Sequence, residues 1–276
     1  MGHLLKDKVA VITGGGRGIG RAVAAAFVEN GASVTVVSRT TSDIDETSKL
    51  LREKGGRVIG IVADVSNRAD VENVVQKTIS GFNSLDVLVN CAGVQKPIGP
   101  FVDNDIDLWI ENFRVNLFGT VFCCKAVFPI MLKNQRGSII NFSGGGATSS
   151  RPNFSSYACS KTAVVKFTEV LADEVKKYNV RVNAVAPGAV NTRMLDEVLE
   201  AGSLAGDELN EAKIRAQKGG VSPDQAAHLA VFLASDKSEG LTGRLISAVW
   251  DNWRDFDADA IRRIMETDKY TLKRVT

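Results

Sequence analysis

The sequence is poor in the residues that build metal centres, histidine-dependent active sites and disulfide frameworks. Its 276 residues include two histidines and four cysteines. Zinc sites and Ser-His-Asp triads depend on histidine, so we expect neither a metal centre nor such a triad. The cysteines show no Cys-x-x-Cys spacing, and we expect reduced thiols in a cytoplasmic protein. They are Cys91, Cys123, Cys124 and Cys159.

An excess of charge of one sign is also missing. There are 34 basic and 32 acidic residues, for a formal net charge of +2. Nucleic acids and anionic membrane surfaces are bound through basic clusters, so we expect neither as a partner. Uninterrupted apolar stretches such as residues 22–28 fall far short of the roughly 18 residues that a spanning helix needs. We therefore expect no membrane-spanning segment. The first residues lack the apolar region of a signal peptide, which favours a cytoplasmic location.

Seven short β-branched runs alternate along the chain with longer helical patterns. Several of the runs are continuously apolar, which is typical of parallel strands buried on both faces. This predicts a single-domain α/β fold of the Rossmann type, a doubly wound parallel sheet of about seven strands with helices on both faces. The predicted strands are residues 9–13, 33–38, 57–63, 85–90, 138–143, 180–186 and 244–249.

No linker, repeat or low-complexity tract divides the chain. We therefore predict one catalytic domain over residues 1–250. Residues 191–221 form a charged, helix-prone excursion with four glycines, which we interpret as a substrate lid and call the lid segment. Residues 251–276 form a charged C-terminal extension that contains Trp253.

A glycine-rich turn stands directly between the first predicted strand and the first predicted helix. Glycines there permit a tight turn and let backbone N–H groups approach a pyrophosphate, while the N-terminus of the helix supplies positive potential. A tight connection selected only for packing is the alternative. We predict a dinucleotide site. Its members in this turn are Gly14, Gly16, Arg17, Gly18, Ile19 and Gly20.

The end of the second predicted strand bears on the choice between NAD and NADP. An NAD site has an acidic residue there for the adenosine ribose 2′-hydroxyl, but this sequence has Ser38 and Arg39. Arg39, with Arg17, would meet a 2′-phosphate through charge-assisted hydrogen bonds, so we predict NADP(H) as the preferred cofactor and NAD(H) as an alternative. In that alternative Arg39 is solvated, and Asp43 or Asp45 binds the ribose.

The ends of the third and fourth predicted strands supply further candidates for the same site. Asp64 and Val65 would flank the adenine. Asn90, Ala92 and Gly93 belong to an Asn-Cys-Ala-Gly sequence that puts small residues where the backbone must approach a cofactor. Gly93 could also serve only as a turn residue.

Tyr157 and Lys161 begin a helical pattern and are four residues apart, a spacing that puts both side chains on one helix face. A tyrosine has an ordinary pKa near 10, and a nearby ammonium group lowers it by stabilising the phenolate. The pair therefore predicts a proton donor and acceptor. An exposed tyrosine beside a solvated lysine is the alternative, and the preceding nucleotide-binding half argues against it.

Taken in order, these motifs resemble the classical short-chain dehydrogenase/reductase family over about residues 6–249. The resemblance implies hydride transfer between nicotinamide and a small-molecule carbonyl or alcohol, with Tyr157 as acid/base. Lys161 would lower the pKa of Tyr157 and hold the nicotinamide ribose, and Asn116 would anchor a water that relays protons. The motif at 187–192 would line the nicotinamide amide through Pro187, Gly188, Val190 and Thr192.

The sequence departs from the family pattern at two places. The serine that orients the substrate oxygen usually lies thirteen residues before the tyrosine, where this chain has Gly144. We assign the role to Ser143, with Thr148 and Ser149 as lesser candidates. The second departure is Ser-Ala-Val-Trp-Asp-Asn-Trp at 247–253, where the family usually has a glycine-rich ending.

Two further functions and an assembly remain open at this point. Gly144 is the one hint of a catalytically weakened nucleotide-binding or interaction protein. Epimerisation through a transient keto intermediate is a third reading.

The family analogy suggests a homodimer or homotetramer formed through the helices near 104–133 and 155–178, unless their apolar residues all pack on the sheet. Those residues are Trp109, Phe113, Phe118, Phe122, Phe167 and Val170.

Overall fold

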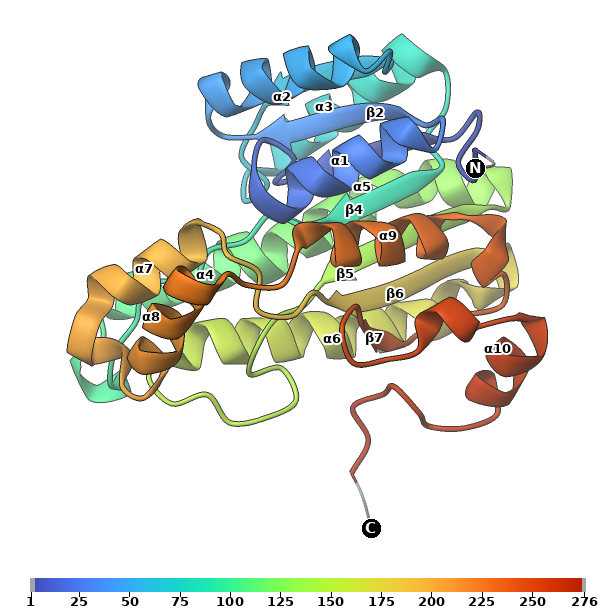
Figure 1. Cartoon of the computed structure of the whole chain (residues 1–276). Coiled ribbons are helices and arrows are strands. Elements are labelled where there is room, and N and C mark those ends of the chain that lie inside the picture. Colours follow the sequence, from blue (N-terminus) through green and yellow to red (C-terminus); the bar gives the residue numbers. More distant parts are fainter. Residues whose placement is uncertain (1–2, 275–276) are drawn as a thin grey trace.

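A computed structural model describes residues 3–274 and shows one seven-stranded sheet with helices on both faces (Figure 1). All strand pairs are parallel, and the strand order is β3-β2-β1-β4-β5-β6-β7. The predicted doubly wound Rossmann-type sheet is thus confirmed. Residues 1, 2, 275 and 276, which the predicted domain and extension include, lie outside the described residues. The strands are β1 (Val9–Thr13), β2 (Ser33–Ser38), β3 (Val58–Val62), β4 (Val87–Asn90), β5 (Gly137–Phe142), β6 (Val180–Ala186) and β7 (Leu245–Ser247).

The strand order reverses between β1 and β4, and this reversal places the functional end of the molecule. β1 pairs with β2 on one side and with β4 on the other. The chain leaves their carboxyl ends in opposite directions, which opens a crevice there in doubly wound sheets. The glycine-rich turn follows β1 and the Asn-Cys-Ala-Gly motif includes the end of β4, so both lie at this crevice.

Helices form a layer on each face of the sheet (Figure 1). α1 (Gly18–Glu29), α2 (Thr41–Glu53) and α9 (Pro223–Ala234) contribute to one core, and α3 (Arg68–Phe82), α5 (Gly119–Asn134) and α6 (Ser155–Val175) contribute to the other. α4 (Ile106–Phe113) leads into α5. Beyond the carboxyl ends of the strands, at the left of Figure 1, lie the helices of the lid segment, α7 (Arg193–Ala201) and α8 (Glu208–Lys218).

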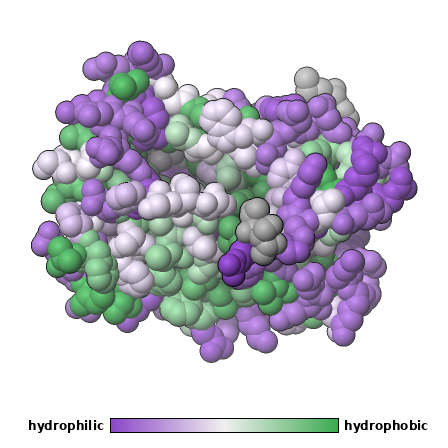
Figure 2. All heavy atoms as spheres, turned by 90° about the horizontal axis from the view of Figure 1, so that it is seen from below, coloured by the Kyte–Doolittle hydropathy of each residue, from purple (hydrophilic) through white to green (hydrophobic). Residues whose placement is uncertain are grey.

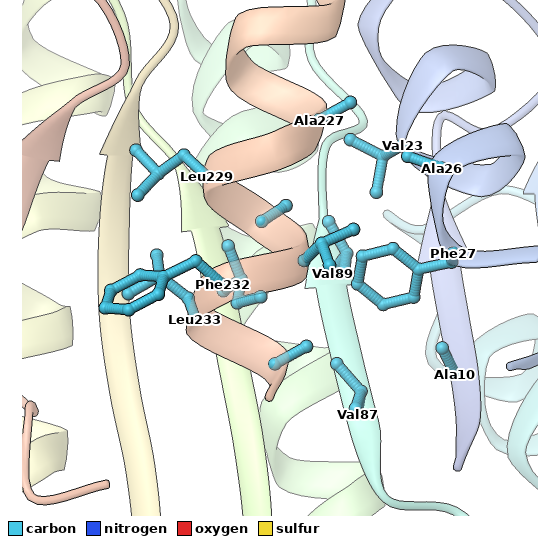
Figure 3. Packing of buried hydrophobic residues seen from close by; sticks show 14 of the residues in the cluster. Ala10, Val23, Ala26, Phe27, Val87, Val89, Ala227, Leu229, Phe232 and Leu233 are labelled. Atoms are coloured by element: carbon cyan, nitrogen blue, oxygen red, sulfur yellow. The ribbon is translucent and has the colours of Figure 1, made fainter. Parts of the chain in front are cut away.

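The first core is formed where α1 and α9 pack side by side over the sheet. Figure 3 shows Phe27 of α1 directed toward Val89 of β4, and it also shows Leu233 on α9. All three are fully buried. α9 is almost entirely apolar, from Ala226 to Ala234, because both its sheet side and its α1 side are covered. Burial on two sides explains why this helix lacks a polar stripe.

The helical stretch Ile106–Asn134 is long and apolar enough, by length and composition, to cross a membrane. Our expectation from uninterrupted apolar runs missed this, because single polar residues interrupt the stretch. In the structure α5 packs on the sheet, and Cys123, Cys124, Val127 and Met131 are buried in the second core. A place in the core of the domain accounts for the apolar composition.

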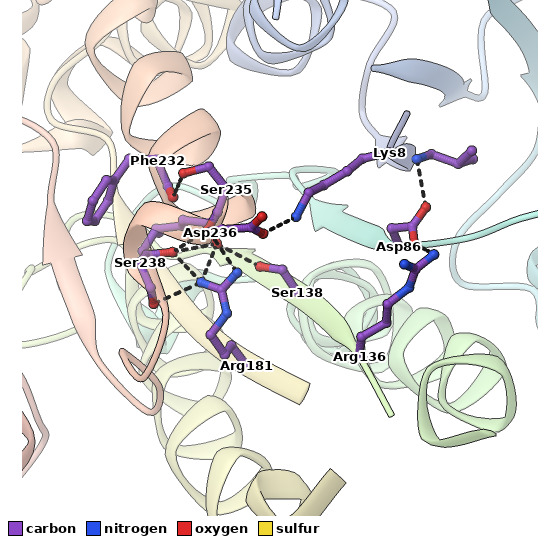
Figure 4. A network of polar contacts seen from close by, with 11 residues as sticks. Lys8, Asp86, Arg136, Ser138, Arg181, Phe232, Ser235, Asp236 and Ser238 are labelled. Atoms are coloured by element: carbon purple, nitrogen blue, oxygen red, sulfur yellow. Dashed lines mark hydrogen bonds and ion pairs between the residues drawn. The ribbon is translucent and has the colours of Figure 1, made fainter. Parts of the chain in front are cut away.

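A polar network holds the opposite, amino-terminal edge of the sheet (Figure 4). Arg181 of β6 donates to the carbonyl oxygens of Leu233, Ser235 and Ser238, at 2.9, 3.0 and 3.0 Å. A cation at this point satisfies the last carbonyls of α9 and offsets the negative end of the helix. We interpret this network as structural, since it lies across the sheet from the crevice.

The C-terminal extension packs against α9 and the edge of the sheet. It contains a short 3-10 turn (Trp253–Asp255) and α10 (Ala258–Met265). The Trp253 ring centroid lies 5.7 Å from that of Phe232, and Ile261 and Ile264 join the first core. The backbone N–H of Leu245 in edge strand β7 donates to the Tyr270 carbonyl at 2.8 Å. The extension therefore covers an edge that would otherwise present unpaired backbone groups.

We predict that Trp253→Ala lowers the free energy of unfolding by about 3–5 kcal/mol, the usual cost of emptying a buried aromatic site. Trp253 is 5% exposed, whereas Trp250 is 83% exposed. Trp250→Ala is therefore a matched control, expected to change stability by less than about 0.5 kcal/mol. Denaturant titration of both variants checks this. If Trp253→Ala changed the free energy of unfolding as little as is expected for Trp250→Ala, the extension would not stabilise the fold through this residue.

Candidate active site

The glycine-rich turn is a close-packed cradle at the N-terminus of α1. A Cβ on Gly14, whose φ is +66°, would lie 2.8 Å from the Ala92 backbone nitrogen, and one on Gly20 would lie 2.1 Å from the Gly14 oxygen. The hydroxyl of Thr13 accepts hydrogen bonds from the N–H groups of Cys91 and Ala92, both at 3.2 Å. These contacts hold the turns after β1 and β4 together, as the predicted dinucleotide site requires.

The N-terminus of α1 is suited to an anion. Arg17 is its N-cap residue and makes no side-chain capping hydrogen bond. The first N–H groups of α1 thus have no capping side chain, and such groups bind phosphate. A Cβ on Gly18 would lie 3.3 Å from the Thr192 side chain, which brings the 187–192 segment to the same turn. Ile19 lines the large cavity described below.

Both alternatives for binding the adenosine ribose meet beside Gly16. A Cβ there would lie 2.8 Å from Cβ of Asp43 and 3.0 Å from Cβ of Ser38. Arg17 lies 3.7 Å from the Asp43 carboxylate, and Arg39 lies 3.6 Å from the Asp64 carboxylate. Both arginines are more than half exposed, and one buried oxygen of Asp43 has no hydrogen-bond partner among the described residues. Asp45 is exposed.

The remaining adenine-side candidates differ in how their side chains are used. Burial alone would raise the pKa of Asp64, but hydrogen bonds from Ser66 and the charge of Arg39 hold it below its ordinary value. Val65 is buried against Gly119. The Asn90 amide donates to the Asn141 side chain at 2.9 Å inside the sheet. The side-chain oxygen of Asn90 is buried and has no hydrogen-bond partner among the described residues.

Tyr157 and Lys161 lie on one face of α6 and are buried, with exposed fractions of 6% and 4%. The ammonium of Lys161 lies 5.8 Å from the centroid of the Tyr157 ring and donates to the Phe142 carbonyl at 2.9 Å. Both side chains line a cavity of about 460 Å³. A Cβ on Gly93 would lie 3.3 Å from the Lys161 nitrogen, so the Asn-Cys-Ala-Gly turn closes over the lysine.

Burial dominates the electrostatics of this pair. It lowers the pKa of Lys161 to about 8, and the neighbouring Cys91 opposes the decrease. It raises the pKa of Tyr157, and the neighbouring cation that opposes the increase is Arg151. Lys161 is not among the charges that lower the pKa of Tyr157 here, so our expectation that it does so stays a prediction. Burial of the phenol outweighs the one opposing cation, Arg151.

Asn116 lies in a π-helical segment (Arg114–Phe118) between α4 and α5, and such segments often mark functional sites. Its side-chain oxygen accepts from the Val94 backbone at 2.9 Å. Its amide donates to Val94, to Asn112 and to Ser160, at 2.9, 2.7 and 3.0 Å. The side chain thus ties the turn after β4 to α6. Its partners Asn112 and Ser160 were not predicted from the sequence. The signal for Asn112 was its spacing of four residues from Asn116, which puts both on one helix face.

Ser143 and Gly144 occupy different positions relative to Tyr157. The Ser143 hydroxyl is buried, lines the cavity and has no hydrogen-bond partner among the described residues. A Cβ on Gly144 would lie 2.1 Å from the Tyr157 hydroxyl. The tyrosine hydroxyl therefore occupies the space that a side chain at 144 would fill. Thr148 and Ser149 also line the cavity but are exposed.

The 187–192 segment forms another wall of the cavity. Pro187, Gly188, Val190 and Thr192 all line it. Thr192 is the N-cap of α7, and its hydroxyl accepts from the Met194 backbone at 3.3 Å. Ile19 of the glycine-rich turn thus lines the same cavity as these residues and as Tyr157, Lys161 and Ser143.

Comparison with known proteins gives the family. The family model described as short chain dehydrogenase matches residues 8–202. The chain belongs to the short-chain dehydrogenase family. Members of this family are NAD(P)-dependent oxidoreductases that act on CH–OH and C=O groups of small molecules. The fold class and the resemblance stated from the sequence motifs are thereby confirmed.

Individual relatives of this short-chain dehydrogenase align over most of their lengths. Short-chain reductase protein NovJ of Streptomyces niveus is 38% identical over 87% of this chain and 92% of its own. Dehydrogenase/reductase SDR family member 4 of Caenorhabditis elegans is 34% identical over 87% and 93%. The crystal structure of NAD⁺-bound xylitol dehydrogenase superposes with a TM-score of 0.83 at 26% identity, covering 88% of this chain and 98% of that one.

Several side chains of this short-chain dehydrogenase line the cavity without having been singled out from the sequence. Gln95, Arg151 and Glu208 come from three separate segments. Arg151 and Glu208 are 57 residues apart and form an ion pair with a nitrogen–oxygen distance of 2.6 Å. No motif spacing could have signalled this contact, since it depends on how the lid segment folds back over the sheet.

Proposed function

We propose that this short-chain dehydrogenase is an NADP(H)-dependent carbonyl reductase, or the reverse alcohol dehydrogenase, that uses Tyr157 as proton donor and acceptor. The observation that carries the proposal is the shared cavity. The tyrosine hydroxyl, the lysine ammonium and the unpartnered Ser143 hydroxyl line one space that continues to Ile19 and Thr192 beside the glycine-rich turn. When bound, the nicotinamide would supply or accept the hydride.

Each residue then has a role set by its position. Tyr157 donates its proton to the substrate oxygen as the carbonyl carbon is reduced, and it takes the proton back in the reverse direction. Ser143 donates a hydrogen bond to the same oxygen and orients it. Lys161 stabilises the phenolate left on Tyr157 and would hold the nicotinamide ribose. Asn116 would anchor the relay water. Its backbone carbonyl oxygen accepts a hydrogen bond from the Thr120 hydroxyl at 2.9 Å.

The residues around the glycine-rich turn fit a dinucleotide. Gly14, Gly16 and Gly20 let the turn pack closely, since a Cβ at each would lie 2.1–2.8 Å from a neighbouring protein atom, and Gly18 takes a φ of +52°. The uncapped α1 N-terminus suits a pyrophosphate. Asp64 and Val65 would flank the adenine, and the 187–192 residues would face the nicotinamide amide. The backbone of Asn90, Ala92 and Gly93 would lie along the cofactor.

The choice of NADP(H) rests on Arg17 and Arg39. Both guanidinium groups are more than half exposed and lie 3.7 and 3.6 Å from their partner carboxylates, so a 2′-phosphate could compete for them. The contrary observation is a buried Asp43 oxygen that has no hydrogen-bond partner among residues 3–274 and could accept from a ribose hydroxyl in NAD(H). The xylitol dehydrogenase of similar fold is described as bound to NAD⁺.

We predict that Arg39→Ala weakens NADPH binding about tenfold to hundredfold, which corresponds to losing one charged hydrogen bond of about 1.5–3 kcal/mol. NADH binding should change less than about threefold, because NADH lacks the 2′-phosphate. Fluorescence titration with each nucleotide measures both constants. Asp43→Asn is the reciprocal variant. A wild-type preference for NADH that Asp43→Asn abolishes would overturn the NADP(H) assignment and leave the dehydrogenase standing.

The structure removes the one hint of a weakened enzyme. Gly144 suggested lost chemistry, but its missing side chain makes room for the Tyr157 hydroxyl. A nearby serine with a free hydroxyl lines the same cavity. No contact in the described part of the chain favours an interaction protein or an epimerase over a reductase.

We also propose self-association through the outer faces of α4 and α6. The apolar and substantially exposed residues are Leu108 and Ile110 of α4, Phe118 of the π-helical segment that follows α4, and Val170 of α6. The view from below shows hydrophobic surface gathered toward the lower left (Figure 2). Exposed apolar patches of this kind mark interaction surfaces. Sedimentation equilibrium should give a dimer or tetramer of the 29.6 kDa chain.

The cytoplasmic location stays a prediction, to be checked by cell fractionation.

A further inference from the structure

Arg151 lies against the proposed acid/base residue. It belongs to the loop between β5 and α6, and its side chain is 15% exposed. Its guanidinium carbon lies 3.9 Å from the ring centroid of Phe154 and 5.2 Å from that of Tyr157. A guanidinium within about 6 Å of a ring face interacts with it directly. Arg151 is thus a second cation beside Tyr157, in addition to Lys161.

The same guanidinium is held by the lid segment. Its Nε and Nη2 atoms donate to the two carboxylate oxygens of Glu208 in α8, at 2.6 and 2.7 Å. Nη2 also donates to the Gln95 side chain at 3.3 Å, and Gln95 donates to the Met194 backbone of α7 at 2.8 Å. Two-point pairing of this kind fixes both partners. Arg151 therefore contacts the base on one side and both lid helices on the other, one of them through Gln95.

We propose that Arg151 is a positioning residue through which the lid segment controls the acidity of Tyr157. While Glu208 is paired with it, the Arg151–Glu208 pair adds almost no net charge beside the ring, and Tyr157 keeps its proton. A displacement of α8 that carries Glu208 away leaves the guanidinium uncompensated and favours the phenolate. The seated lid segment thus favours the proton-donor form that carbonyl reduction needs. This inference rests on the proposed function of Tyr157.

The electrostatics of the site agree with this arrangement. Burial raises the pKa of Tyr157, Arg151 opposes the increase, and Cys91 and Glu208 add to it. Other charged side chains face the same space from α6 and α8. Among the described residues, the titratable side chains that act on Tyr157 or line its cavity with it are Cys91, Arg151, Lys161, Glu208, Glu211 and Arg215. Among them, the bidentate contact singles out Arg151 and Glu208 as the two members of one pair.

The scarcity of tyrosine makes a direct test practical. The chain has three tyrosines, Tyr157, Tyr178 and Tyr270. In the full chain carrying Tyr178→Phe and Tyr270→Phe, tyrosinate absorbance near 295 nm reports Tyr157 alone, and tryptophan fluorescence reports whether the protein stays folded at each pH. Glu208→Gln, Arg151→Gln and Glu208→Asp are compared in this background. Glu211→Gln is the matched control for charge on α8.

We expect Glu208→Gln to lower the pKa of Tyr157 by about one pH unit and Arg151→Gln to raise it, since neighbouring unit charges shift a pKa by about this much. Glu208→Asp, which keeps the charge, should return the pKa close to that of the parent. Glu211→Gln should shift it less than Glu208→Gln does. A merely structural pair behaves differently, because breaking it from either side admits water and lowers the pKa in both variants.

Shifts of the same sign, or none, would overturn the proposal. The absorbance measurement needs no turnover, so it separates this inference from the proposed function. Opposite shifts in a protein that reduces no carbonyl would retain the coupling and reject the function. Turnover that depends on Tyr157, without opposite shifts, would do the reverse. In active enzyme, the pH profile of kcat/KM should move in the same direction as the absorbance transition.

Discussion

Replacing Tyr157 by phenylalanine should lower kcat by about 10²–10⁴-fold, the usual contribution of a positioned general acid. The ring would stay in place, because it is buried between the cavity and Arg151. Only the hydroxyl that donates the proton is lost. NADPH affinity should stay within about twofold of wild type, since the change removes an interaction with the reacting oxygen and leaves the glycine-rich turn intact.

The measurement is steady-state oxidation of NADPH with a panel of ketones and aldehydes, beside a fluorescence titration of the nucleotide. Tyr178→Phe is the matched control, because it removes the same hydroxyl at a half-buried position at the end of α6, away from the cavity. It should leave kcat unchanged. Turnover retained by Tyr157→Phe would remove Tyr157 from the mechanism and with it the proposed function.

The sheet could be predicted from the sequence because buried parallel strands leave a clear apolar signal. β1 has the predicted bounds, Val9–Thr13. The predicted boundaries fail where a turn ends the pairing. The last strand was predicted over 244–249, but β7 ends at Ser247, one residue before the Ala248 N–H donates to the Ala186 carbonyl at 2.9 Å. The chain then turns, and the Ser247 N–H donates to the Asp251 carboxylate at 2.6 Å. Such a turn depends on the extension that follows.

The site was predictable in its motifs and unpredictable in its electrostatics. Local spacing places Tyr157 and Lys161 on one helix face, and the structure confirms that geometry. The balance of their pKa values depends on burial, which no spacing reports. The Arg151–Glu208 pair depends on the docking of α8 over the cavity. Contacts between segments far apart in sequence, each without a motif, are the part that the sequence alone does not reveal.

Ser143→Ala should lower kcat by about 10²–10³-fold, which corresponds to roughly 2.7–4 kcal/mol of barrier, as expected when a donor to a developing oxyanion is removed. The Ser143 hydroxyl is buried at the cavity and has no hydrogen-bond partner among the described residues, so it is available to the substrate oxygen. The same NADPH oxidation assay measures the effect. Ser150→Ala is the matched control, because Ser150 is exposed in the same loop and does not line the cavity.

Gly144→Ser separates the two positions that could hold this serine. It restores a hydroxyl thirteen residues before Tyr157, yet its Cβ would lie 2.1 Å from the Tyr157 hydroxyl. A contact that short displaces the tyrosine, so Gly144→Ser should lower kcat in the wild type and fail to rescue Ser143→Ala. Full activity in the Ser143→Ala/Gly144→Ser double variant would contradict this and return the role to position 144. Only a hydroxyl that reaches the cavity without moving Tyr157 can orient the substrate, and in this fold Ser143 meets that condition.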